Sequence, residues 1–132
     1  MALSCVAVTL SACGGNGTTS SEASLDDQSI QKIITLKNQL VTLLASKTDL
    51  ISKTIRSHQV THIGALQLFL KTDSLPSPIP TGATTASLHQ TLRALADLTR
   101  TMTPKLNDDE VQRTFLLISA SDAVQSTLVE SL

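Results

Sequence analysis

Aromatic residues are almost absent from this chain of 132 residues, which contains two phenylalanines and neither tryptophan nor tyrosine. Sites for sugars and for single-stranded nucleic acids usually stack their ligand on aromatic rings. Tight protein interfaces often use Trp and Tyr as anchors. The shortage of rings therefore disfavours a sugar site, a single-strand binding site and an interface built on large aromatic side chains.

A charge excess is also lacking, because the net charge is −1 and the ten basic residues are scattered. Binding to nucleic acid needs clustered Lys and Arg, so no nucleic-acid partner is expected. No glycine-rich phosphate loop is present, since the glycine-rich run at residues 14–17 precedes no predicted strand. Apolar residues make up 41% of the chain, which is enough for one folded domain.

The two cysteines are Cys5 and Cys13, and the second closes the phrase Leu10-Ser11-Ala12-Cys13. This phrase follows an apolar stretch and resembles the lipobox of bacterial lipoproteins, in which small residues precede an acylated cysteine. The resemblance implies that residues 1–12 form a signal peptide and that Cys13 becomes the lipidated N-terminus. Two or more acyl chains would then hold the protein stably on a membrane.

The lipobox resemblance also implies a location in the bacterial cell envelope. Gly14 follows the cysteine, which resembles the pattern of lipoproteins on the periplasmic face of the outer membrane in double-membraned bacteria. No Lys or Arg precedes Lys32, whereas secretory signals open with a basic segment. We therefore interpret the signal as truncated at its start.

Two other interpretations of the N-terminus remain open. Cys5 and Cys13 could be ordinary residues of a tail or a disulfide pair, or the chain could be a soluble protein whose start only mimics a lipobox. A permanent transmembrane helix is not expected, because the apolar stretch is about half of the ~20 residues that a span requires.

The rest of the chain predicts a linker over residues 13–24 and a helical domain over residues 25–132. Residues 14–24 are rich in Gly, Ser and Thr, a composition typical of flexible tethers. Apolar residues then recur at helical spacing over residues 25–58, 61–71, 84–102 and 107–130, with Ser24 and Asn107 as N-caps. The first of these stretches forms either one long helix or two helices. Three alternating prolines over residues 76–80 exclude a helix and form a stiff connection, or alternatively a ligand for aromatic grooves.

No segment predicts a strand, so we expect an all-α fold: a small antiparallel bundle of three to four helices after a flexible N-terminal tether. In the last helix the spacing predicts six inward apolar residues, namely Val111, Phe115, Leu117, Ile118, Val124 and Leu128.

Two charged residues interrupt predicted apolar faces, Lys47 between Leu43 and Leu50, and Asp122 in the last helix. A buried charge is costly unless it is paired or reaches water. The simpler interpretation is that the stem of Lys47 covers the core while its amine reaches solvent. If both charges point inward, they could form a polar ligand-binding pocket within the bundle.

His58 and His62 are four residues apart and would share one face of a continuous helix, where they could bind one metal ion. The metalloprotease pattern requires Glu directly after the first His, and this chain has Gln59. A third ligand is not evident nearby in sequence, although His89 could approach in space. The alternative is that the two histidines mark a helix end.

Residues 39–51 are similar to the long first helix of the all-helical chorismate mutases. That family carries Arg and Lys at the positions matching Lys47 and His58, and an Arg-Glu pair near Leu70 and Lys71. These positions are changed, so the cations that would hold a dicarboxylate substrate are not present residue by residue. The resemblance implies at most a bundle of related shape.

These observations favour a non-enzymatic, lipid-anchored envelope protein without a cofactor, whose helical domain contacts another envelope protein or stabilises an assembly. The alternative is a helical protein that binds a small ligand or a metal, with Lys47, Asp122 and the histidines lining its site.

Overall fold

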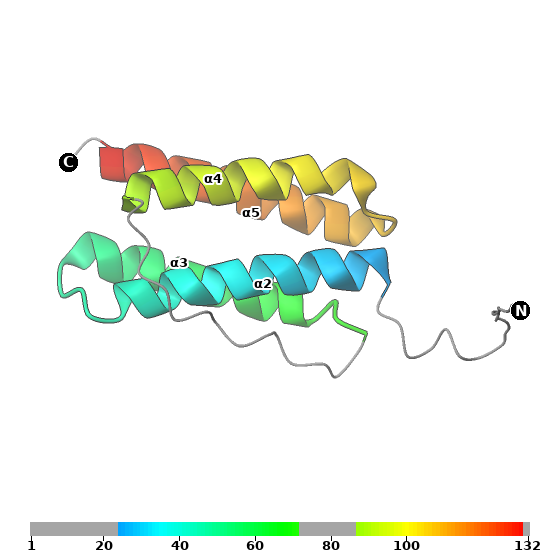
Figure 1. Cartoon of the computed structure of the whole chain (residues 1–132), viewed down its shortest axis with the longest axis horizontal. Coiled ribbons are helices and arrows are strands. Elements are labelled where there is room, and N and C mark those ends of the chain that lie inside the picture. Colours follow the sequence, from blue (N-terminus) through cyan, green and yellow to red (C-terminus); the bar gives the residue numbers. More distant parts are fainter. Residues whose placement is uncertain (1–23, 72–86, 131–132) are drawn as a thin grey trace, which may run out of the picture.

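The computed structural model describes residues 24–71 and 87–130. These ranges contain four α-helices and no strand (Figure 1), which confirms the predicted all-α bundle. The elements are α2 (Leu25–Leu44), α3 (Leu50–Gln67), α4 (Leu88–Met102), the short 3-10 helix η2 (Thr103–Lys105) and α5 (Asp109–Glu130). The lipobox-like phrase, Cys13, the predicted tether before Ser24 and the proline-rich segment lie outside the described residues.

The helical stretch beginning at residue 25, for which the sequence left open one helix or two, forms two helices, because the chain leaves the helical path at residues 45–49. Ser24 caps α2 as predicted, accepting a hydrogen bond from the Asp27 amide at 3.0 Å. Asp49 caps α3, accepting from the Ser52 amide at 2.8 Å. A short polar side chain that binds backbone amides favours a new helix start over continuation of the previous helix. The stretch predicted separately at residues 61–71 belongs largely to α3.

The N-termini of the last two helices are also fixed by side chains. Ser87 and Gln90 form a reciprocal capping box at the start of α4. At α5 the capping residue is Asp108, whose carboxylate accepts from the Glu110 and Val111 amides. The prediction of Asn107 as the cap is therefore wrong by one residue.

The helices form two hairpins, α2 with α3 and α4 with α5 (Figure 1). α2 packs beside α3 and α4, and α5 packs beside α4 and α3, so α2 and α5 lie diagonally across the bundle. Neighbouring helices run antiparallel, as predicted (Figure 1). α3 ends at the opposite end of the bundle from the start of α4 (Figure 1).

All four helices contribute to one apolar core. The ring of Phe115 is fully buried in it. The other buried members are Ile30, Ile33, Ile34, Leu40, Leu44, Ile55, Ile63, Leu66, Leu92, Leu95, Leu106, Val111 and Ile118. The helices within each hairpin contact one another more extensively than the two hairpins do. The interactions between the hairpins therefore determine much of how the hairpins are placed against each other.

Candidate functional site: a buried polar cluster

A lysine ammonium group lies inside the bundle. Lys37 of α2 is fully buried, and its Nζ donates hydrogen bonds to Oδ2 of Asp122 on α5 and to Oε1 of Gln59 on α3, each at 2.7 Å. A third neighbour, Nδ1 of His62 on α3, lies 3.2 Å from Nζ. Three partners match the three N–H groups of an ammonium ion. Lys37 thus joins the diagonal helices α2 and α5.

Two buried glutamines extend this cluster. Nε2 of Gln59 donates to Oδ1 of Asp122 at 2.7 Å and to Oε1 of Gln125 at 3.0 Å. Nε2 of Gln125 donates to Oγ of Ser121 at 3.0 Å and lies 3.2 Å from Nδ1 of His58. His58 is exposed, so the hydrogen-bonded chain runs from the centre of the bundle to its surface.

Burial sets the electrostatics of the lysine. Removal from water disfavours the charged amine and lowers the pKa of Lys37, while the negative charge of Asp122 opposes this change. The Lys37–Asp122 ion pair and its short hydrogen bonds therefore compensate a desolvation cost that either charge alone would leave unopposed.

The imidazole of His62 stays neutral at ordinary pH. Its burial, together with the positive charge of Lys37, lowers the pKa of His62 to about 4, although Asp122 acts in the opposite direction. Because an ammonium group only donates, Nδ1 of His62 accepts from Lys37 and the ring proton lies on Nε2. Oδ1 of Asp122 lies 3.6 Å from the same Nδ1.

The cluster is saturated by its own members. In the part of the chain that the structure describes, no buried side-chain nitrogen or oxygen lacks a hydrogen-bond partner. A fully paired polar network in a low-dielectric core fixes one arrangement of its helices, because any slip would leave buried groups unpaired. This cluster therefore sets the register between α2, α3 and α5.

The structure places Lys47 away from this cluster. Lys47 is exposed in the connection between α2 and α3, because α2 ends at Leu44 and the helical spacing no longer applies there. The hypothesis of an inward Lys47–Asp122 pair is therefore wrong for Lys47, which is exposed. Asp122 is buried, as that pair requires, and its partner is Lys37.

His58 and His62 share one continuous helix, α3, rather than marking its end. Their Nδ1 atoms are directed to different groups, the amide of Gln125 and the ammonium of Lys37. Among the described residues, no group of three or more His, Cys, Asp and Glu could hold a metal ion. His89 contacts the Ser126 carbonyl oxygen through its Nδ1 at 2.9 Å. The positive charge of Lys37 would also repel a cation bound at His62.

Lys37 was missed in the sequence analysis although the pattern contains a signal for it. The buried positions of α2 are spaced by three or four residues, and Lys37 occupies one of them; the series includes Ile30, Ile33, Ile34, Lys37, Leu40 and Leu44. Gln59 interrupts the buried series of α3 in the same way, between Ile55 and Ile63. Polar residues on two such stripes predict a cluster, and Asp122 supplies its negative charge.

From Leu116 to its C-terminus, α5 is largely reversed in polarity. Its inward side is polar, with Ser119, Asp122, Gln125 and Ser126 all buried. Its outward side is apolar, and four large side chains there are strongly exposed: Leu116 (51%), Leu117 (72%), Val124 (60%) and Leu128 (57%). The predictions that Val111, Phe115 and Ile118 face inward are confirmed, while those for Leu117, Val124 and Leu128 are wrong.

An apolar groove lies between α2 and α4, with a volume of about 470 Å³. Its floor and walls are largely aliphatic, and Gln39, Gln90 and Thr91 are its polar lining residues. The aliphatic lining residues are Leu36, Leu40, Leu43, Ala94, Leu95 and Leu98. The groove lies at one of the two seams between the hairpins.

Comparison of the chain with protein-family models, curated proteins and solved structures finds no match. None of the helices in the described ranges is both long and apolar enough to cross a membrane.

Proposed function

We propose that this chain is a lipid-anchored bacterial envelope protein whose helical bundle serves as a non-catalytic interaction domain. Cys13, in the lipobox-like phrase, would carry the anchor, and residues 14–24 would hold the bundle away from the membrane surface. The observation that supports the interaction role is the exposed apolar side of α5.

This side gathers its exposed apolar residues along one helix. With Ala120, which is also exposed, Leu116, Leu117, Val124 and Leu128 make up what we call the outer α5 face. The four large side chains expose on the order of 400 Å² of apolar surface, a size typical of functional contact patches. Exposure of that area to water is unfavourable, so a partner that covers the face would be stabilised.

The arrangement of the polar cluster supports a non-catalytic role. Lys37, Asp122 and Gln59 use their hydrogen-bonding groups on one another, and this pairing joins three helices. Catalytic acids, bases and nucleophiles need to reach a substrate. The cluster is better suited to holding the bundle rigid, which keeps the outer α5 face fixed for contact.

The anchor is tested by metabolic labelling with a clickable palmitate analogue, with the protein expressed from its native locus in its own host, so that any upstream part of the signal is included. We expect the wild-type chain and a Cys5→Ser variant to incorporate the label and a Cys13→Ser variant to lose it. The intact mass of the labelled protein should correspond to a chain that begins at Cys13 with added acyl groups. A chain that keeps residues 1–12 and takes no label would reject the lipoprotein proposal.

A second candidate function is binding of a small apolar ligand in the groove between α2 and α4. The groove volume of about 470 Å³ falls within the range of ligand sites in proteins. Leu40 of α2 and Leu95 of α4 both line the groove, so each hairpin contributes to it. Titration with a fluorescent fatty acid should give saturable binding that an Ala94→Trp variant abolishes by filling the groove; equal binding by both proteins would reject this candidate.

A further inference from the structure

We infer that the partner of the outer α5 face is a second copy of the same chain, packed antiparallel against it to form a two-fold symmetric dimer. This inference rests on the proposed interaction function, because it names the partner of that surface. It is argued from the spacing, the small residues and the charges of α5.

The spacing along the face is that of a helix that pairs with another helix. Leu117, Ser121, Val124 and Leu128 follow one another at steps of four, three and four residues. Such steps keep a row of side chains on one side of a helix and are the spacing of a helix–helix seam. Because the members of this row are all uncharged, a second helix could cover it without burying a charge.

The row of side chains on one copy of α5 matches the row on a second copy that runs in the opposite direction. A two-fold axis requires that each contact occurs twice with the two copies exchanged. If the axis passes between Ala120 and Ser121, Leu117 of one copy lies opposite Val124 of the other, and the same contact repeats on the far side. The small side chains of Ala120 and Ser121 then lie at the axis, where two helix backbones approach most closely.

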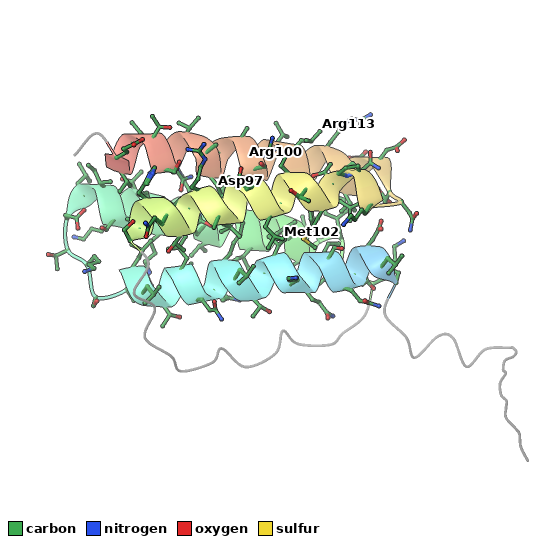
Figure 2. All side chains as sticks on the ribbon, turned by 45° about the horizontal axis from the view of Figure 1, so that its top comes forward. Asp97, Arg100, Met102 and Arg113 are labelled. Carbon is green, nitrogen blue, oxygen red and sulfur yellow. The ribbon has the colours of Figure 1, made fainter. Side chains whose placement is uncertain are left out.

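The charges favour an antiparallel over a parallel pair. Arg113 lies in the first half of α5 and is exposed, with its label on α5 in Figure 2, and Glu130 ends the helix. Antiparallel packing brings Arg113 near the last turn of the partner helix, where the negative end of the helix dipole attracts it. Parallel packing would place Arg113 beside Arg113, which is repulsive.

The size of the face indicates a reversible dimer. Roughly 400 Å² of apolar side chain per copy is about half of the ~800 Å² that a partner contributes to a standard stable interface. Confinement of lipid-anchored chains to a membrane would raise their effective concentration and favour the dimer.

The test uses the full-length chain in cell membranes, with a photo-crosslinking amino acid placed at position 124. We expect illumination to give a product of twice the chain mass that contains only this protein. The same amino acid at position 93, on the charged outer side of α4, serves as the matched control and should give at least tenfold less of this product.

The geometry is tested with charge variants in two differently tagged copies. Leu117→Glu alone and Val124→Lys alone should each reduce co-purification of the two tags at least tenfold, while Leu50→Glu, at a similarly exposed leucine on α3, should not. Co-expression of one Leu117→Glu copy with one Val124→Lys copy should restore co-purification, because the antiparallel arrangement places the introduced carboxylate of one copy opposite the introduced ammonium of the other. Circular dichroism of each purified variant checks that the exposed substitutions leave the bundle folded.

The outcomes separate the two proposals. Failure of the mixed pair to recover would overturn the antiparallel arrangement, and an absence of the double-mass product at position 124 would overturn self-association. A crosslink from position 124 to a different protein would overturn the second copy as partner and leave the interaction function standing. Palmitate labelling at Cys13 is a separate measurement. Failure of the lipoprotein proposal can therefore be distinguished from failure of the dimer proposal.

Discussion

α4 and α5 form one hairpin, yet they distribute polar and apolar side chains in opposite ways. α4 buries Leu92, Leu95 and Ala96 and exposes charged residues, of which Asp97 and Arg100 are labelled in Figure 2. The second half of α5 buries Asp122 and Gln125 and exposes large apolar side chains. The side-chain distribution of α4 is explained by folding of a single chain in water, whereas the proposed contact role accounts for the exposed apolar side of α5.

The difference between α4 and α5 distinguishes the contribution of apolar burial from that of buried polar pairing. Apolar burial on α4 contributes stability that depends little on which helix lies opposite. The polar side of α5 fixes the position of α5 against α2 and α3, because Asp122 must meet Lys37 and Gln59. The exposed apolar side of α5 is then available for association at a defined orientation.

The largest effect is expected from Asp122→Ala. This change leaves the Lys37 ammonium buried without its counter-ion, and loss of one member of a buried pair typically costs about 3–5 kcal/mol. The matched control is Asp97→Ala on α4, which removes an exposed carboxylate bonded to Arg100 and should cost less than about 1 kcal/mol. Urea unfolding followed by circular dichroism measures both free energies.

A double variant checks the cause of that loss. Lys37→Met combined with Asp122→Leu removes both charges and should recover much of the stability lost in Asp122→Ala, because no unpaired charge remains. If Asp122→Ala costs no more than Asp97→Ala, the cluster does not fix the bundle and the contrast between α4 and α5 loses its structural basis.

A smaller loss of stability is expected when the apolar side of α4 is truncated, and almost none when the outer α5 face is truncated. Leu92→Ala on the buried side of α4 should lower the free energy of unfolding by about 2–4 kcal/mol, since it removes buried methyl groups and leaves a cavity. Leu117→Ala on the outer α5 face should change it by less than about 0.5 kcal/mol in dilute protein. Thermal unfolding at low concentration makes the comparison; a large loss for Leu117→Ala would show that this side belongs to the core.

The sequence predicted the fold class well, for a physical reason that also explains its failures. Helical spacing and capping residues such as Ser24 are local signals, and they act through contacts within a few residues of the chain. The sequence left open whether residues 25–58 form one helix or two, because continuation and re-initiation of a helix differ by small local energies.

The candidate site was only partly accessible from sequence. Asp122 was recognised as an inward charge, but its partner depends on how two hairpins pack, which no spacing within one helix records. The choice of Lys47 assumed that apolar residues alone define the buried side of a helix. Lys37 occupies a buried position because Asp122 and Gln59 bind it, and the same contacts turn Leu117 and Val124 outward.

The smallest effect concerns the pH dependence of the cluster on the inward side of α5. His62 has a pKa of about 4 in the folded protein and about 6.5 when unfolded, so below pH 6.5 the unfolded chain binds the proton more readily. His62 should therefore leave the free energy of unfolding unchanged above pH 6.5 and lower it as the pH drops from 6.5 towards 4. The expected loss is about 1–2 kcal/mol, because partial exposure of the ring to water weakens the electrostatic interactions of His62.

His62→Gln isolates this contribution, because glutamine can accept from Lys37 but does not titrate. Urea unfolding between pH 7.5 and 4.5 should show a steeper fall for the wild-type chain than for His62→Gln, with the curves parallel above pH 6.5. Carboxylates titrate in both proteins and cancel in the difference. Identical slopes across the whole range would mean that His62 is not held neutral beside Lys37. The cluster on the inward side of α5 would then be accessible to water, as the charged outer side of α4 is.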